Sequence, residues 1–214
     1  MRTLVAVVAA LALALAGTAA AAPPDVSKAL LTPSQVGVAY LLLQRTDGHG
    51  LGTRTLDLCG TSNYPSEKLR TARIQVDYGR NGSTLTLSNE VVAYKPGGAA
   101  QAMREVIDHA TNCPHTAISP GVQGLPPLTF QITRLKAGRL LNGYLAVKVR
   151  VTGTVKGKKV DQISYAVYQR LGNVLSGVYS NGPATPQQMA FCLHAAEQSA
   201  RNLRRLQAPS GPTV

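Results

Sequence analysis

Alternating apolar and basic residues in segment 144–155 constrain the fold more than any other feature. Apolar side chains occupy every second position from Leu145 to Val151, and Lys148 and Arg150 lie between them. Successive side chains of a β-strand point to opposite faces of its sheet. The segment is therefore predicted to be a strand with one face in a core and the other in water.

Further strands are predicted on both sides of this segment. Segments 128–135, 160–170 and 174–180 have similar strand character, and their turns are marked by Gly138, Gly157 and Gly172-Asn173. Earlier in the chain, 72–78 and 83–95 flank Asn81-Gly82, a typical hairpin turn. Strands joined by such short turns pair antiparallel.

Two amphipathic helices complete the pattern. Apolar positions recur at spacings of four and three from Ala99 to Cys113, before Pro114, and a second apolar stripe follows Thr185-Pro186. Thr32-Pro33 begins a short capped helix that Gly37 ends. Because amphipathic helices need a surface to cover, we predict an α+β fold, with a curved antiparallel sheet of about six strands and helices packed against it. Segment 38–71 is expected to be irregular.

The N-terminus has the features of a secretory signal peptide. Arg2 is followed by an apolar run at 4–16 and by small residues before Pro23-Pro24. The alternative, a retained membrane anchor, is disfavoured because the run is shorter than the roughly 20 residues that span a bilayer. The small-residue segment also lacks the cysteine that a lipid anchor requires. We expect a signal peptide at 1–21, a single domain at 22–206, a disordered tail at 207–214, and a secreted protein without a lipid anchor.

Positive charge is the strongest signal in the composition. The chain has 22 Lys and Arg against 10 Asp and Glu, and no acidic residue lies between Asp108 and Asp161. A basic exported protein is attracted to anionic surfaces such as cell-wall polymers. Ordinary decoration of a soluble sheet is the competing interpretation. Nucleic acid is not favoured, because no binding motif accompanies the charge. The candidate binding residues are Lys148, Arg150, Lys156, Lys158 and Lys159.

His109, Cys113 and His115 lie within seven positions of each other, so they raise the question of a metal site, a reactive thiol or a disulfide. A zinc site needs three or four ligands, and a fourth is not evident nearby. Export favours oxidised sulfur. We therefore predict a disulfide at Cys113, with Cys59 or Cys192 as partner, and no metal or other cofactor.

Catalytic motifs are missing from the chain. It contains no G-x-S-x-G elbow, no H-E-x-x-H helix and no phosphate-binding loop. His194 and Glu197 are three residues apart in the last predicted helix, but such a pair is usually a surface contact. We therefore predict that the protein is not an enzyme.

Several short motifs resemble a known family. The sequence Leu-Leu-Thr-Pro-Ser-Gln-Val-Gly at 30–37 is followed by the loop residue Cys59, a hairpin and an alanine-rich helix that leads to Cys113. This order is similar to the PknH-like extracellular sensor domains, which include secreted and lipoprotein relatives in actinobacteria, and the resemblance spans residues 27–205. It implies a disulfide between Cys59 and Cys113, a cleft beside the sheet for ligand binding or sensing, and no established chemistry. The chain lacks the family's usual tryptophan and second disulfide, which leaves Cys192 without a partner.

Two classes of function remain. In the first, the protein is a secreted, non-catalytic ligand-binding or sensor-like domain at the bacterial cell envelope, with a small amphiphile in an apolar cleft. In the second, it is a basic interaction protein that docks on an anionic cell-wall polymer or an acidic protein. Salt separates the two, because charge-driven docking weakens as ionic strength rises.

Overall fold

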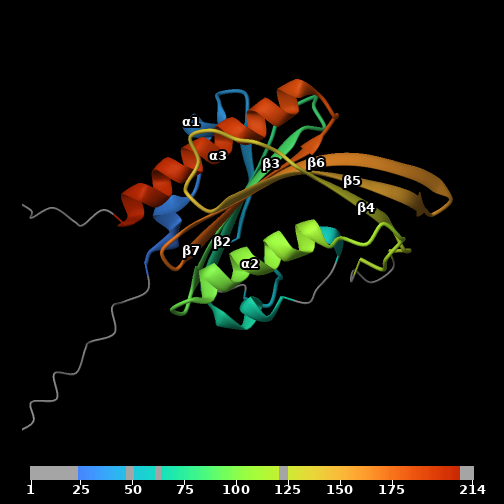
Figure 1. Ribbon diagram of the computed structural model, residues 1–214. Helices are drawn as coiled ribbons and strands as arrows, with labels where there is room; N and C mark the ends of the chain where they lie inside the picture. The colour runs from blue at the N-terminus through green and yellow to red at the C-terminus, as the bar shows by residue number, and fades with distance from the viewer. Residues whose placement is uncertain (1–23, 47–50, 61–63, 121–124, 208–214) are drawn as a thin grey trace, which may run out of the picture.

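One antiparallel sheet organises the molecule. The computed structural model describes residues 24–46, 51–60, 64–120 and 125–207, and within them seven strands follow the order β1-β2-β3-β7-β6-β5-β4 (Figure 1). The predicted signal peptide at 1–21 lies outside the described residues. So does the predicted tail at 207–214, except for Gln207, which is the last residue of the final helix.

The elements follow one another in a simple order. The described part of the chain begins with the short helices η1 (Val26–Ala29) and α1 (Pro33–Val36), and η2 (Leu58–Gly60) and η3 (Pro65–Leu69) lie between the first and second strands. The long helices are α2 (Gly98–Thr111) and α3 (Pro186–Gln207). The strands are β1 (Leu41–Thr46), β2 (Arg70–Gly79), β3 (Thr86–Tyr94), β4 (Thr129–Arg134), β5 (Tyr144–Val155), β6 (Lys158–Leu171) and β7 (Val174–Gly182).

The α+β class and the antiparallel sheet are confirmed, but the sheet has seven strands and not about six. The additional strand is β1, which lies in the segment expected to be irregular. Its sequence, Leu-Leu-Leu-Gln-Arg-Thr, does not alternate, and its pairing with β2 shifts register between Leu42 and Gln44. A strand at the edge of a sheet, with most of its residues exposed, has no reason to show the two-residue period of a half-buried strand.

Helices cover both faces of the sheet (Figure 1). Helix α3 packs on one face with η1, around residues such as Val91, Val167, Val178 and Leu203. Helix α2 packs on the opposite face, where a second core is formed by Val92, Val106, Val147, Tyr168, Leu175 and others.

The strand β5 shows how the sheet departs from the predicted single wet face. Leu145, Ala146 and Val147 are consecutive and all buried. The expectation of a water-exposed face was therefore wrong for the centre of the sheet, because the two helices lie on opposite faces and each needs an apolar surface. The expectation of a water-exposed face is correct further along β5, where Arg150 is exposed.

Cys59 and Cys113 form a disulfide, with a Cα–Cα distance of 5.7 Å. The bond ties the segment before β2 to the end of α2. Cys192 is a buried free thiol on α3, so the alternative pairing of Cys113 with Cys192 does not occur. Burial raises the pKa of the Cys192 thiol to about 12.

His109 and His115, the two histidines near the disulfide, lie in different environments. The His109 ring packs on the Tyr64 ring with a centroid distance of 4.4 Å, and His115 is exposed. Among the described residues, no group of three His, Cys, Asp or Glu side chains is arranged to hold a metal ion. No helix in the described part of the chain is long and apolar enough to cross a membrane.

Candidate ligand-binding cleft

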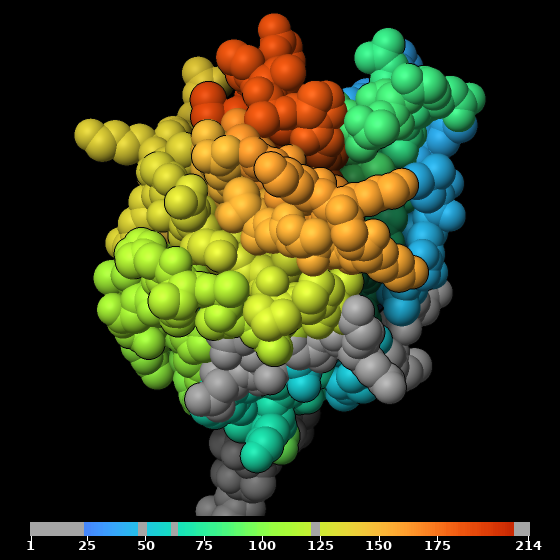
Figure 2. All heavy atoms as spheres, turned by 90° about the vertical axis from the view of Figure 1, so that its right-hand side faces the viewer, coloured from blue at the N-terminus to red at the C-terminus, as the bar shows by residue number. Residues whose placement is uncertain are grey.

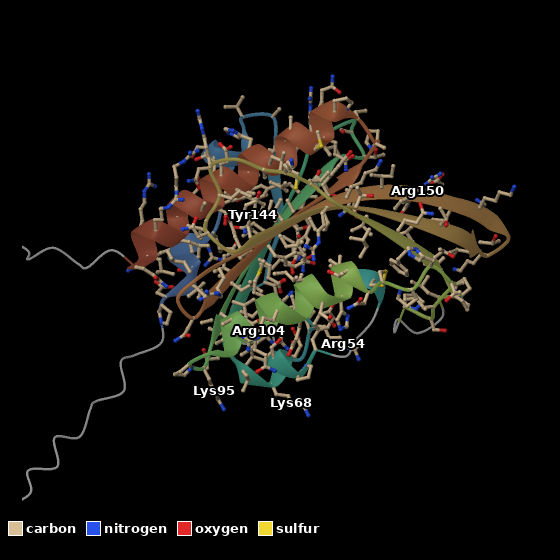
Figure 3. All side chains as sticks on the ribbon, in the orientation of Figure 1. Arg54, Lys68, Lys95, Arg104, Tyr144 and Arg150 are labelled. Carbon is tan, nitrogen blue, oxygen red and sulfur yellow. A yellow bond between two sulfur atoms is a disulfide. The ribbon has the colours of Figure 1, made fainter. Side chains whose placement is uncertain are left out.

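A cleft of about 350 Å³ lies on the α2 face of the sheet, and its lining includes Cys59, the disulfide partner of Cys113 just after α2. Its floor is formed by side chains of β2, β3, β7, β6 and β5. Its wall is formed by the segment from Arg54 to Cys59 and by Phe130 of β4. Figure 3 labels Arg54 near the end of α2.

The polarity of the floor changes in the order of the strands. At one end, β2 and β3 contribute charged and polar side chains, and at the other end β5 and β4 contribute apolar ones. The tyrosines and small polar residues of β7 and β6 lie between them. The lining residues in this order are Arg73 and Gln75, Ser88 and Glu90, Tyr179 and Asn181, Ser164, Tyr165, Ala166 and Tyr168, Val149 and Val151, and Phe130.

A buried ion pair occupies the polar end. The Arg73 guanidinium contacts the Glu90 carboxylate, and the two residues are only 4% and 2% exposed. Arg73 Nη2 also donates to Gln75 Oε1 at 2.6 Å, and the Tyr179 hydroxyl donates to Glu90 Oε2 at 3.4 Å. Burial raises the pKa of Glu90 to about 7, although the charge of Arg73 opposes this shift. The pair is held in place from three strands.

The middle of the floor is formed by two aromatic rings. Tyr168 and Tyr179 pack edge to face, with ring centroids 5.6 Å apart. Burial raises the pKa of both phenols well above its ordinary value, so both remain neutral. These rings separate the charged end of the cleft from its aliphatic end.

The wall is fixed by hydrogen bonds as well as by the disulfide. The Glu67 carboxylate accepts from the backbone N–H groups of Thr55 and Leu56, at 3.1 and 3.3 Å. The buried Arg70 guanidinium contacts Glu67 at 3.0 Å and donates to the carbonyls of Thr53 and Leu51 at 2.7 and 2.6 Å. The wall is therefore held in its position before any ligand arrives, which lowers the entropic cost of binding.

The basic residues singled out from the sequence lie outside this cleft. Lys148 is half-buried, and Arg150 donates to both carboxylate oxygens of Asp161 at 2.8 and 2.6 Å. Lys156 is in the turn between β5 and β6, and Lys158 and Lys159 are exposed at the start of β6.

The register of β5 and β6 determines which of these side chains share a face. Lys159 pairs with Thr154, so it lies on the same face as Lys148 and Arg150. Lys158 pairs with Val155 and points to the opposite face. Figure 3 shows Arg150 on the long β5–β6 arm, well separated from Arg54 at the cleft wall.

Arg73 and Glu90 were not identified from the sequence. In β2, Arg73 and Gln75 alternate with the apolar Ile74 and Val76, a pattern that is typical of a face in water. The structure places that polar face in the cleft. The available signal was Glu90, a carboxylate directly before the apolar residues 91–94 at the end of β3.

Comparison with known proteins gives a fold but no sequence relative. No protein-family model matches the chain, and no curated protein matches it. A crystal structure of the extracellular domain of PknH from Mycobacterium tuberculosis superposes with a TM-score of 0.51, covering 82% of this chain and 94% of that domain at 14% identity.

The chain has the fold of the PknH extracellular domain. This shared fold confirms the resemblance noted in the sequence. At 14% identity the comparison carries no information about particular residues. The chemistry of the cleft in this PknH-like chain therefore has to be argued from its own side chains.

Proposed function

We propose that the protein is a secreted, non-catalytic, sensor-like binding domain of the bacterial cell envelope, and that its cleft holds a small amphiphile. The observation that carries this proposal is the change in polarity along the cleft floor, from Arg73 and Glu90 to Val149, Val151 and Phe130. A ligand with a polar head and an apolar body matches both ends at once. The cleft volume of about 350 Å³ lies within the range of small-molecule sites.

The polar end favours an uncharged head group. Arg73 and Glu90 form an ion pair, and the wall adds one cation and one carboxyl group, Arg54 and Asp57, so the lining offers a charged head no excess of opposite charge. The hydroxyl and amide groups of Tyr179, Ser88 and Asn181 lie in the same part of the lining and are suited to hydrogen bonding.

The cysteine and the two buried tyrosines of the lining are not suited to nucleophilic catalysis. Of the described residues that line the cleft, Cys59 is in the disulfide and the phenols of Tyr168 and Tyr179 have raised pKa values. A nucleophile needs an adjacent base and an activated state. The sulfur of Cys59 is bonded to Cys113 and neither phenol is ionised at neutral pH, so none of the three is an activated nucleophile.

Two further observations support a location outside the cell. The disulfide between Cys59 and Cys113 is the form that cysteine takes in oxidising compartments. The solved domain with the same fold is an extracellular one.

Binding of octanol, octanoate and octylamine to the mature chain tests the proposal. These probes share one chain length and differ in head charge, and their affinities can be measured by calorimetry at low and high salt. We expect octanol to bind at least as tightly as the two charged probes, with less than a threefold change in affinity on addition of salt. Absence of binding by all three probes, or binding that disappears in salt, would contradict a cleft for amphiphiles.

A second candidate function rests on the lysines at the tip of the β5–β6 arm. Lys156, Lys158 and Lys159 are exposed within four positions, which suits docking on an anionic cell-wall polymer or an acidic protein. Arg150 contributes less, because Asp161 already binds it. Soluble polyglutamate is a suitable probe. Docking predicts affinity that falls steeply with salt and with Lys158→Glu, whereas binding of octanol in the cleft should not respond to that change.

A further inference from the structure

The strand β7 ends before its neighbour β6 does. β6 pairs with β5 from Lys158 onward, but it pairs with β7 only from Ile163 onward, where Ile163 lies opposite Gly182. Residues 158–162 of β6, which we call the arm edge, are therefore paired on one side only within the described part of the chain. Their pairing with β5 has no register shift, so no bulge disrupts the arm edge.

The sequence after β7 explains why that strand stops. Pro183 follows Gly182 and has no N–H group to donate to a ladder. The Thr185 N–H then donates to the Pro183 carbonyl at 2.8 Å, and the chain turns away from β6 into α3. The arm edge is left with N–H and C=O groups that can pair with another strand. Figure 2 shows β6, in orange, at the centre of this face of the molecule, with the green β2–β3 turn at the upper right.

Hollows lie on both faces of the sheet beside the arm edge. The hollow on the α2 face has a volume of about 520 Å³ and includes Val151 in its lining. The hollow on the other face has a volume of about 290 Å³ and includes Arg150. Both border Gln162 and Gly182, at the point where β7 ends. Because side chains of a strand alternate between faces, a strand added here would place them in both hollows.

The charge of the arm edge indicates the class of partner. Lys158 and Lys159 are exposed there, whereas the carboxylate of Asp161 is already bound by Arg150. A second copy of this chain would bring the same two lysines to the contact, and like charges on neighbouring strands oppose pairing. Glutamate or aspartate opposite the lysines would instead form favourable cross-strand pairs. The arm edge therefore suits an acidic segment and disfavours a second copy.

We propose that the arm edge binds an extended acidic segment of another protein, which pairs antiparallel with β6 in the place that a longer β7 would occupy. In this mode of recognition the main-chain hydrogen bonds supply affinity, and alternate side chains supply specificity. The inference rests on the second candidate function, for which it gives the partner and the binding mode. It does not require an amphiphile in the cleft.

The register of the sheet predicts which residues the segment needs on the α2 face. A strand in line with β7 has its first residue opposite Gln162 and its fifth opposite Lys158. Its first and third residues, opposite Gln162 and Val160, lie on the same face as Val151. Apolar side chains suit these two positions, because Val151 and Val160 offer them apolar contacts.

The remaining positions meet charged groups. The fourth and fifth residues lie opposite Lys159 and Lys158, so glutamate suits both. The second residue lies opposite Asp161, whose carboxylate oxygens already accept from Arg150 at 2.8 and 2.6 Å, so an uncharged side chain suits it. The pentapeptide Val-Thr-Val-Glu-Glu satisfies all five positions.

Binding of this pentapeptide to the mature chain tests the inference. The peptide carries an N-terminal acetyl group and a C-terminal fluorescein, and fluorescence anisotropy at low salt gives its dissociation constant. Two N-methylated forms are compared with it, one methylated at the first, third and fifth residues and the other at the second and fourth. Both keep the charge and the side chains. Because only alternate N–H groups of a strand face a given neighbour, one form should lose about tenfold or more in affinity and the other should bind like the unmodified peptide.

A pair of charge reversals in the chain tests the position of the contact. Lys159→Glu should weaken binding of the pentapeptide by about tenfold, because it replaces an attractive cross-strand pair with a repulsive one. Lys95→Glu is the matched control, since Lys95 is also exposed and its reversal changes the net charge equally. Figure 3 shows Lys95 at the lower left and Arg150 of the arm at the upper right. Lys95→Glu should leave the affinity nearly unchanged.

Other results would overturn the proposal. Equal losses from the two methylation patterns, or no loss from either, would mean that the peptide backbone is not paired with β6. Equal effects of Lys159→Glu and Lys95→Glu would place the contact away from the arm edge. If soluble polyglutamate binds and the pentapeptide does not, the second candidate function stands and strand addition is wrong; if neither binds, both are wrong. Circular dichroism of each variant establishes that it is folded.

Discussion

Arg73 on β2 and Glu90 on β3 form an ion pair that is almost completely buried, at the charged end of an otherwise mixed cleft. Removing one partner leaves the other charge buried without compensation. We therefore expect Arg73→Met to lower the free energy of unfolding by about 3 kcal/mol, measured by urea unfolding at neutral pH.

The double variant Arg73→Met with Glu90→Leu is the control for this prediction. Because it removes both charges, its stability should be closer to that of the wild type than the stability of Arg73→Met is. A double variant that loses the sum of the two single losses would show that the residues do not interact.

The raised pKa of Glu90 predicts a particular dependence of stability on pH. Glu90 binds its proton more tightly in the folded protein, with a pKa of about 7, than in the unfolded chain, where the value is about 4.5. Its contribution to stability is therefore complete below pH 4.5 and is lost as the pH rises toward 7. The loss is on the order of 3 kcal/mol.

Comparison with Glu90→Gln isolates this effect, because the amide does not titrate. The difference in unfolding free energy between the wild type and Glu90→Gln should change between pH 4.5 and 7, with the wild type losing stability relative to the variant. Burial also raises the pKa of Glu67. Because Glu67 is present in both proteins, its contribution cancels in this difference. A difference that stays constant over this range would contradict the assigned pKa.

The disulfide closes a loop with a sequence separation of 54 residues. In the chain-entropy model such a bond stabilises the fold by about 4 kcal/mol. We expect Cys59→Ala with Cys113→Ala to lower the unfolding free energy by about that amount. Dithiothreitol should lower the unfolding free energy of the wild type to that of the variant, and it should not change the unfolding free energy of the variant. A wild type that is insensitive to reduction would argue against the bond.

Cys192 is predicted to be unreactive. It is 0% exposed, and the pKa of its thiol is about 12, so almost no thiolate exists at neutral pH. Ellman's reagent should therefore detect no thiol in the native protein and one after unfolding in urea without reductant. Detection of a thiol in the native state would mean that α3 opens readily or that Cys192 is exposed.

Much of the fold could be predicted from the sequence because its elements carry strong periodic signals. The predicted apolar stripe of α2, from Ala99 to Ala110, is buried against the sheet. The strand β5 was predicted with the same bounds that the structure gives. β1 could not be predicted, since an exposed edge strand needs no alternation. The positions of α2 and α3 on opposite faces depend on contacts distant in sequence, which periodicity does not encode.

The cleft was harder to predict for a related reason. Arg73 and Gln75 look like the wet face of a strand, and only the disulfide-anchored wall at 54–59 turns that face into the floor of a cleft. The pairing of Cys59 with Cys113 was implied by a family resemblance and is present in the structure. Lys148, Lys156, Lys158 and Lys159 were chosen as candidate binding residues because the charge of a residue can be read from the sequence. Whether a residue lies in an enclosed cleft cannot.

The central claim is that an amphiphile occupies the cleft with its apolar part against β5. Val151 lines the cleft, and Thr152 follows it on the opposite face of the strand. Calorimetric titration of octanol into Val151→Lys and Thr152→Lys, which add the same charge at adjacent positions, tests the claim most directly. The account predicts at least a tenfold loss of affinity for Val151→Lys and an unchanged affinity for Thr152→Lys. Equal affinities in the two variants would contradict it.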